Sequence, residues 1–253
     1  MPILTTVAER RAAFRALHQS GCFTLPNPWD GGTARRLERA GFKALASTSA
    51  GAAWALGKDD GEMSVDEVLE HLHFLCAITN LPVNADFEAG FAATADGVAT
   101  NVTRSIATGV CGLSIEDRNG ASFYALDEAV ARIKAARAAI DASGQNVILV
   151  GRCEAYLMDT VDMNEVVTRL RAYCAAGADC LYAPGLRKLS DIERIVQSVD
   201  KPVNGNLTGT GLSAADLAAV GVRRVSVGAA LAKATYAAFD VFVQVLRDKG
   251  RLP

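Results

Sequence analysis

Acidic side chains follow several short apolar runs of this sequence, at points where strands are expected to end. Asp86 and Glu88 follow one such run and stand one residue apart, so on an extended chain they point to the same side. Glu116 follows a later run, and Asp60 lies in a loop between two runs. Like charges in one pocket cannot all stay ionised without compensation. Because oxygen ligands suit a hard cation, the four carboxylates predict a Mg²⁺ site, with Mn²⁺ as second choice.

An arginine and a stretch of small residues also stand at expected strand ends. Arg152 ends the apolar run VILVGR, where a guanidinium requires an anionic partner. That partner is either a substrate carboxylate or Glu154, two residues later, and the sequence leaves both open. Thr48, Ser49 and Ala50 belong to the segment TSAG, whose hydroxyl and backbone N–H groups can bind a carboxylate or an oxyanion. A plain tight turn is the alternative for this segment.

Other polar residues have ordinary structural interpretations. Asp30 and Asp117 also follow apolar runs, but a lone aspartate there most often caps the next helix or bonds to its loop. His18, His71 and His73 lie in expected helices and are interpreted as packing or surface residues. A histidine general base is therefore not expected.

The elements that must position these residues follow a repeating pattern of an apolar run, a loop and a helical segment. Most of the runs are continuously apolar, which is typical of parallel strands covered by helices. The expected strands span residues 22–26, 44–48, 82–86, 112–117, 146–152, 180–184, 202–206 and 223–227.

Eight such units in one chain of this length predict an α/β fold of the (β/α)₈ (TIM) barrel type, with an extra helix at about residues 5–20. A doubly wound open sheet is the second choice, although no G-x-G-x-x-G follows the first strand. In a barrel of this kind the active site lies where the strands run into the following loops. The residues considered above would then share one end of the barrel.

Local signals support the helices between these strands. Ser64 precedes a helical pattern and is followed three residues later by Glu67, a capping box. Gly144, Gly177 and Gly221 stand where three later helices should stop. These signals set helix boundaries without reference to the rest of the fold.

Composition excludes several functional classes. The chain has 253 residues, a formal net charge of −2, and no linker or low-complexity tract, so residues 1–253 are expected to form a single domain. The near-neutral balance gives no basic surface for nucleic acid or a membrane, and no apolar run is long enough to span a bilayer. The N-terminus does not read as a signal peptide, and the six cysteines lack metal-ligand spacing. The sequence therefore predicts a cytoplasmic protein.

Taken in order, these motifs resemble the isocitrate lyase / phosphoenolpyruvate mutase superfamily, in its methylisocitrate lyase-like and phosphonomutase-like branch. The similarity runs from PNPWDG near residue 26 to VSVGAAL near residue 225. NADFEAGF is similar to the family's D-x-D-x-G-[YF] metal motif, with Glu88 in place of the second aspartate. GLSIEDR is similar to its I-E-D signature, GRCEAY to A-R-x-[DE]-A, and NGNLTGTG to an N-x-T segment of the lyase branch.

The resemblance implies a metal-dependent enzyme. Asp86 would bind Mg²⁺ directly, and Asp60, Glu88 and Glu116 would hold its waters. The substrate would be a small 2-oxo or 2-hydroxy carboxylic acid that chelates the metal. The reaction would be carbon–carbon cleavage, or decarboxylation or hydrolysis, through a metal-stabilised enolate. The family also implies a homo-oligomer, a tetramer or a dimer.

The resemblance also implies roles for residues that contact the substrate. The residues that would bind the substrate are Thr48, Ser49, Ala50, Arg152, Asn206 and Thr208. Arg152 and Glu116 would also take part in catalysis.

One departure from the family pattern lies in the loop after Glu116. In the lyases this loop carries a cysteine, and in the phosphonate enzymes it carries a lysine and an asparagine. Here residues 119–124 contain no cysteine, lysine or histidine, so the general acid is not identified. Tyr124 is the leading candidate, with Tyr182 and Ser122 beside it. Three alternatives stay open: phosphorus–carbon chemistry on phosphoenolpyruvate or phosphonopyruvate, a non-catalytic 2-oxo acid binder, and a phosphate site near the last two strands.

Overall fold

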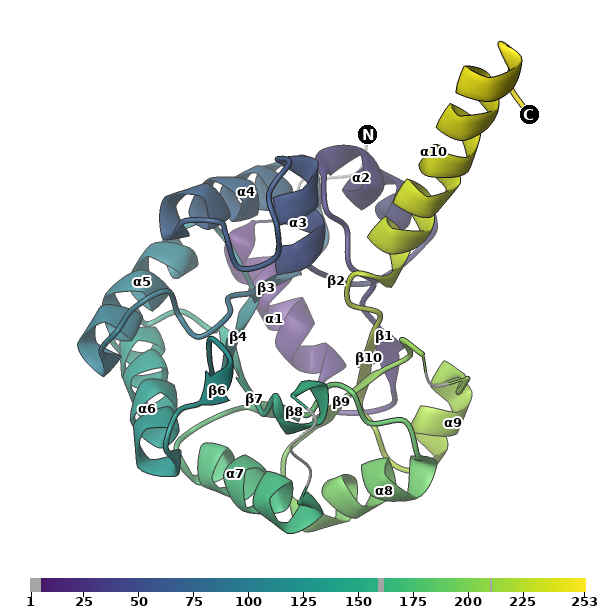
Figure 1. Ribbon diagram of the computed structural model, residues 1–253. Coiled ribbons are helices and arrows are strands. Elements are labelled where there is room, and N and C mark those ends of the chain that lie inside the picture. The colour runs from purple at the N-terminus through teal and green to yellow at the C-terminus, as the bar shows by residue number, and fades with distance from the viewer. Residues whose placement is uncertain (1–5, 159–161, 210) are drawn as a thin grey trace.

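The structure, a computed structural model, describes residues 6–158, 162–209 and 211–253 (Figure 1). Eight parallel strands form one sheet in the order β1-β10-β9-β8-β7-β4-β3-β2. Their bounds are β1 Phe23–Thr24, β2 Leu45–Ala46, β3 Val83–Asp86, β4 Gly112–Glu116, β7 Ile148–Arg152, β8 Cys180–Tyr182, β9 Val203–Asn206 and β10 Arg224–Ser226. Each strand lies inside one of the eight apolar runs that the sequence singles out.

The sheet closes on itself between β1 and β2, the two strands at the ends of this order. The backbone N–H of Ala46 donates to the carbonyl of Pro26 over 3.1 Å. The Asn27 side chain donates to the carbonyl of Ser47 over 2.8 Å, across the same seam. Figure 1 views the resulting ring along its axis. The predicted (β/α)₈ barrel is thereby confirmed, and the open doubly wound sheet is excluded. The assignment of residues 1–253 to a single domain stays a prediction.

Helices cover the outside of the ring (Figure 1). They are α2 Gly31–Arg39, α4 Val65–Ile78, α5 Ala95–Ala107, α6 Leu126–Ala142, α7 Met163–Ala175, α8 Leu189–Ser198 and α9 Ala214–Ala219. Strand residues alternate between the two faces of the sheet. Leu113, Leu149 and Leu181 point outward and are fully buried in the main hydrophobic core, against the helices. The strand residues directly before and after each of these leucines point into the barrel, and the site is built from such inward-pointing residues.

Helix α1 (Val7–Leu17) is the predicted extra helix, and it closes the amino-terminal end of the barrel. Thr6 and Glu9 form a capping box at its start. Phe14 is fully buried and packs with Ile148 and Val150, which point into the barrel from β7. The interior is therefore plugged at this end, and the opposite end, where the strands finish, remains available for a site.

Three loop segments carry structure that the sequence interpretation did not include. The TSAG segment begins a helix, α3 (Ser49–Ala55), instead of forming a plain turn. The reason is local: the Thr48 hydroxyl accepts a hydrogen bond from Gly51 N over 3.3 Å and caps a run rich in alanine. After β4 the chain forms a short hairpin, β5 (Arg118–Asn119) and β6 (Ser122–Phe123). After β7 a 3₁₀ turn, η1, spans Ala155–Leu157.

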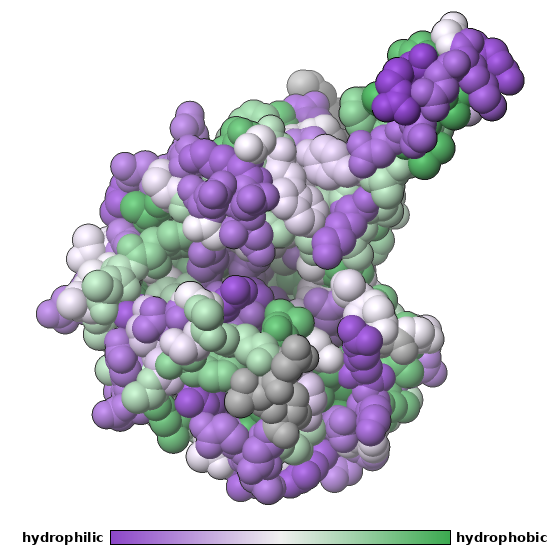
Figure 2. All heavy atoms as spheres, in the orientation of Figure 1, coloured by the Kyte–Doolittle hydropathy of each residue, from purple (hydrophilic) through white to green (hydrophobic). Residues whose placement is uncertain are grey.

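Helix α10 (Ala230–Lys249) extends away from the barrel (Figure 1). Phe239, Phe242, Val243 and Leu246 are each 44–63% exposed. Their spacing of three and four residues places them on one side of the helix, as an apolar stripe. Hydrophobic residues are visible along α10 in Figure 2. Across the described parts of the chain, no helix combines the length and the apolar character needed to cross a membrane.

Candidate active site

Arg152, at the end of β7, is held by carboxylates from three segments of the chain. Its Nη1 lies 2.9 Å from Asp86 Oδ1 and 3.3 Å from Glu116 Oε2, and its Nε donates to Glu154 Oε1. Burial opposes the charge on the guanidinium, but Glu154, Glu116 and Asp86 outweigh it and hold the pKa of Arg152 well above its ordinary value. The pairing with Glu154, which the sequence left open, is thus present, and Nη1 also binds the two other acids.

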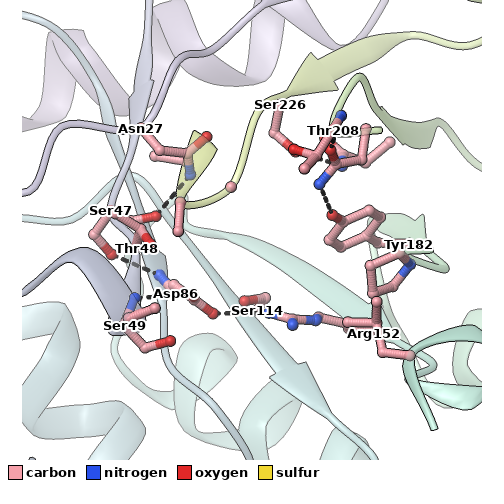
Figure 3. Close-up of a pocket in the computed structure, with 18 of the residues that line it drawn as sticks. Asn27, Ser47, Thr48, Ser49, Asp86, Ser114, Arg152, Tyr182, Thr208 and Ser226 are labelled. Atoms are coloured by element: carbon pink, nitrogen blue, oxygen red, sulfur yellow. Dashed lines mark hydrogen bonds and ion pairs between the residues drawn. The ribbon is translucent and has the colours of Figure 1, made fainter. Parts of the chain in front are cut away.

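Asp86 connects this arginine to the end of β2. Its Oδ2 accepts a hydrogen bond from Ser49 N over 3.1 Å, and its own N–H donates to Ser47 Oγ over 2.8 Å. Figure 3 shows Asp86 between Ser49 and Arg152. The N–H of Ser49, expected to be free for a substrate, is used by Asp86 in this arrangement. Asp86 therefore has a fixed orientation at the centre of the site.

Two adjoining cavities open at this end of the barrel, and Figure 2 shows the hollow at the centre of this face. The first has a volume of about 350 Å³ and the second about 430 Å³, and both are lined by Ser49, Asp60 and Arg152. The first is also lined by the predicted residues Thr48, Ala50, Asp86, Asn206 and Thr208, and the second by Glu88, Glu116 and Tyr124. Every site residue predicted from the sequence thus lines one of these cavities, while the roles of these residues stay predictions.

Glu88 does not share a side with Asp86 as the sequence pattern implied. Strand β3 ends at Asp86, and Glu88 has a φ of 43°, in the left-handed region that costs a glutamate about 1 kcal/mol or more. The alternation of an extended strand no longer applies there. Asp86 therefore lines the first cavity and Glu88 the second.

Two of the three glutamates that line the second cavity have a raised pKa. Burial, with the charges of Asp86 and Asp60, raises the pKa of Glu88 to about 7. Burial likewise raises the pKa of Glu116 to about 8; Arg152 opposes the shift and the neighbouring acids add to it. The protonated forms of both groups are therefore populated near neutral pH unless a further positive charge arrives.

The donor set fits a hydrated divalent cation. Four carboxylates line the second cavity against two guanidinium groups, Arg118 and Arg152, so the cavity has an excess of two negative charges when all four acids are ionised. Glu88 Oε1 is buried and has no hydrogen-bond partner among the described residues. No three acidic, histidine or cysteine side chains in the described ranges are grouped closely enough to enclose an ion. Mg²⁺ characteristically keeps several waters and uses one or two carboxylates directly, so such a set can still hold it.

The three candidate proton donors are placed differently. Tyr182 lies beside the first cavity, where its hydroxyl accepts a hydrogen bond from Asn206 Nδ2 over 2.7 Å. Burial raises the pKa of Tyr182, so it keeps its proton. Tyr124 lines the second cavity with Glu116. Ser122 is exposed in the hairpin and lines neither cavity. The structure thus brings both tyrosines to the site and leaves Ser122 outside it.

Asp117 has a role that the sequence interpretation missed. It does not cap the following helix, whose N-cap position has no side-chain hydrogen bond. Its side chain is 1% exposed, and Oδ1 accepts from Glu154 N over 2.9 Å. Its Oδ2 accepts from Tyr173 Oη over 2.6 Å and from Arg169 Nη1 over 3.3 Å. Asp117 thereby fixes the backbone of Glu154, the residue that binds Arg152.

Substituting Asp117→Asn is expected to lower the free energy of unfolding by about 3 kcal/mol, because it leaves the Arg169 guanidinium without its buried counter-charge. Urea unfolding measures this difference. The matched control is Glu165→Gln, which removes the other carboxylate bound to Arg169, one that is 51% exposed. An exposed pair of this kind contributes about 0.5 kcal/mol. Equal losses in the two variants would contradict the role assigned to Asp117.

The closed barrel, with acids and Arg152 at its strand ends, has the architecture of a TIM-barrel enzyme site. The sequence model of the phosphoenolpyruvate phosphomutase family matches residues 14–246, so the chain belongs to that family and to the isocitrate lyase / phosphoenolpyruvate mutase superfamily. This confirms the resemblance inferred from the motifs. The protein is an enzyme of the carbon–carbon lyase type found in this superfamily.

Individual relatives cover most of the chain. A crystal structure of a Burkholderia cenocepacia J2315 protein described as a lyase or mutase superimposes with a TM-score of 0.95 at 44% identity, covering 97% of this chain and 91% of that one. The oxaloacetate decarboxylase of Paraburkholderia xenovorans LB400 is 27% identical over 265 residues, covering 99% of this chain and 84% of that protein. The 2-methylisocitrate lyase of Escherichia coli K12 is 31% identical over 186 residues, covering 69% of this chain and 61% of that protein.

Proposed function

We propose that the protein is a Mg²⁺-dependent lyase that cleaves or decarboxylates a small 2-oxo or 2-hydroxy carboxylic acid. The observation that carries the proposal is Arg152, a largely buried guanidinium that binds Asp86 and Glu116 and lines both cavities, the second of which is also lined by four carboxylates. A fixed positive charge stabilises negative charge that develops on a substrate oxygen during bond cleavage. Relatives with the names 2-methylisocitrate lyase and oxaloacetate decarboxylase support this class of reaction.

Each part of the site then has a task. Asp86 would bind the ion directly, and Asp60, Glu88 and Glu116 would bind it through water. When bound, Mg²⁺ supplies a Lewis acid next to the substrate's oxygens, and Mn²⁺ can replace it. Arg152 binds and orients the same end of the substrate. The remaining binding residues are Thr48, Ser49, Ala50, Asn206 and Thr208.

Proton transfer is assigned to the second cavity. Tyr124 lines this cavity together with Glu116. A protonated carboxyl or a phenol can donate to a carbanion that forms next to the carbonyl. We assign Tyr124 as the general acid.

Two alternatives are supported by specific features. The match to the phosphoenolpyruvate phosphomutase family supports phosphorus–carbon chemistry. The short hairpin formed by β5 and β6, without cysteine, lysine or histidine in residues 118–124, supports a protein that binds 2-oxo acids without turning them over.

A substrate screen with and without EDTA tests these possibilities. Oxaloacetate, 2-methylisocitrate, alkylmalates and phosphonopyruvate are supplied with Mg²⁺, and pyruvate, CO₂ and phosphate are measured. We expect EDTA-sensitive release of a 2-oxo acid or of CO₂ from at least one of the carboxylic acids. Phosphate release from phosphonopyruvate alone would favour the phosphorus–carbon alternative. Binding of oxalate without turnover of any compound would favour the non-catalytic binder.

We also propose a homo-oligomer in which a second copy of the chain covers the apolar stripe of α10. Large apolar residues are costly to leave in water along one helix face. Substituting Phe239→Glu together with Phe242→Glu is expected to convert the oligomer to a monomer. Light scattering after size-exclusion chromatography measures the mass.

The control for this experiment is Gln244→Glu, which adds a negative charge on the opposite side of the same helix. It is expected to leave the oligomer intact. A monomeric wild-type protein, or an oligomer that survives both phenylalanine substitutions, would show that α10 does not form the contact.

A further inference from the structure

Arg224 lies in the interior of the barrel, beneath the site described above. It belongs to β10 and is 3% exposed. Ser226, two residues later on the same strand, points the same way, so Arg224 lies about 7 Å deeper along the barrel. Arg224 lines the first cavity, the one that Arg152 and Asp86 also line. The first cavity is therefore lined by Arg152 near the strand ends and by Arg224 deeper in the barrel.

The groups that bind Arg224 are all neutral. Its Nε donates to Asn204 Oδ1 over 2.8 Å, and its Nη1 donates to Asn84 Oδ1 over 3.2 Å. His18 Nε2 lies 3.5 Å from Nη1, and His18 Nδ1 lies 2.8 Å from the carbonyl of Phe14. A neutral imidazole that donates from Nδ1 presents Nε2 as the acceptor. Within the described ranges, no acid forms an ion pair with Arg224, and no atom accepts a hydrogen bond from its Nη2.

The other buried arginines either have an acidic partner or use every nitrogen atom as a donor. Arg11 donates only to neutral groups, but its Nε, Nη1 and Nη2 all have an acceptor. Arg132 is 1% exposed, donates to three backbone carbonyls and pairs with Glu128. Arg169 pairs with Asp117.

The Cys180 thiol is close enough to affect the pKa of Arg224 if it were ionised. Burial raises the pKa of this thiol to about 11, so it stays neutral. Because an arginine does not lose its proton in a protein, Arg224 remains a buried charge without a counter-ion.

We propose that Arg224, together with Asn84 and Asn204, forms an anion subsite at the floor of the cavity that binds a carboxylate group. The amides fix the plane of the guanidinium and leave Nη2 for the ligand. The carboxylate comes either from the far end of a dicarboxylate substrate or from a free small anion. The first source rests on the proposed function, because Arg152 would bind the near end of the same molecule. A guanidinium matches a carboxylate in charge and geometry.

Two measurements, each made on wild type and on Arg224→Gln, distinguish a carboxylate of the substrate from a free anion. In calorimetric titrations with Mg²⁺, malate is expected to bind wild type at least 10-fold more tightly than lactate, which lacks the distal carboxylate. In Arg224→Gln this preference is expected to fall to about 1, with lactate binding unchanged. Formate, a free carboxylate, is expected to raise the melting temperature of wild type and not that of Arg224→Gln.

A second variant keeps the test valid if Arg224→Gln folds poorly. Asn204→Asp places a carboxylate of almost the same shape on Arg224. It is expected to raise the melting temperature in anion-free buffer and to abolish the response to formate. The matched control is Asn101→Asp, a buried asparagine whose amide donates to two carbonyls, and it is expected to lower the melting temperature.

The outcomes distinguish the subsite from the proposed function. A malate preference that depends on Arg224 supports the substrate as the source, and a formate response alone supports a free anion. The absence of both in wild type, or a melting temperature lowered by Asn204→Asp as much as by Asn101→Asp, would overturn the subsite. Failure of oxalate to bind with Mg²⁺, together with an Arg224-dependent formate response, would refute the metal-dependent lyase and leave the subsite standing.

Discussion

Arg152→Met is expected to lower kcat/KM by about 10³-fold. The substitution removes a fixed positive charge that stabilises the developing negative charge, and losses of 10²–10³-fold are typical when one such donor is removed. It also leaves Glu154, which is 1% exposed, without its guanidinium partner. Steady-state kinetics on the compound that wild type turns over fastest measures the effect.

Arg187→Met is the matched control for Arg152→Met. Arg187 lines the same cavity but is exposed, and it makes no ion pair within the described part of the chain. Its loss is expected to lower kcat/KM by less than about 10-fold, as for a screened surface charge. Similar losses in both variants would mean that Arg152 contributes only to the general positive potential of the cavity.

Asp86→Asn is expected to abolish the metal-dependent binding of oxalate, a mimic of a pyruvate enolate. The amide keeps the shape and removes the charge that would bind Mg²⁺ directly. The loss of affinity for oxalate should exceed roughly 10–100-fold, which is the loss typical of changing a residue that only hydrogen-bonds to a metal ligand. Calorimetric titration of oxalate, with Mg²⁺ and then with EDTA, measures it.

The control for Asp86 is Asp59→Asn, which removes an exposed acid that lines neither cavity. Its oxalate affinity is expected to equal that of wild type. Unchanged Mg²⁺-dependent binding in Asp86→Asn would mean that this acid serves only to hold Arg152 and Ser49.

The barrel was predictable because its elements are specified by local patterns. Every strand lies within one of the eight runs found in the sequence, and most of these runs are continuously apolar, as is typical of parallel strands covered by helices. The capping box at Ser64 and Glu67 is present at the start of α4, and its two partners are three residues apart in the chain. The TSAG segment was harder to interpret, because a helix of seven residues carries little periodic signal.

The site residues could be found from their place at strand ends, but their mutual arrangement could not. Asp86 and Glu88 separate into two cavities because the backbone at Glu88 leaves the extended conformation, which the residue types do not indicate. Asp117 meets Tyr173, 56 residues away, on a helix face that no local pattern directs toward it. Arg224 carried a usable signal: an arginine inside an apolar run that must be a buried strand.

The position of α1 gives the site a single entrance. Because Phe14 seals the far end of the barrel, anything that reaches the floor at Arg224 must first pass Arg152 and Asp86, and must leave by the same route. The order in which ligands enter and leave the cavity is therefore set by how deep in the barrel they bind. If a dicarboxylate is cut between the two arginines, the fragment near the mouth departs first and the fragment at the floor departs last.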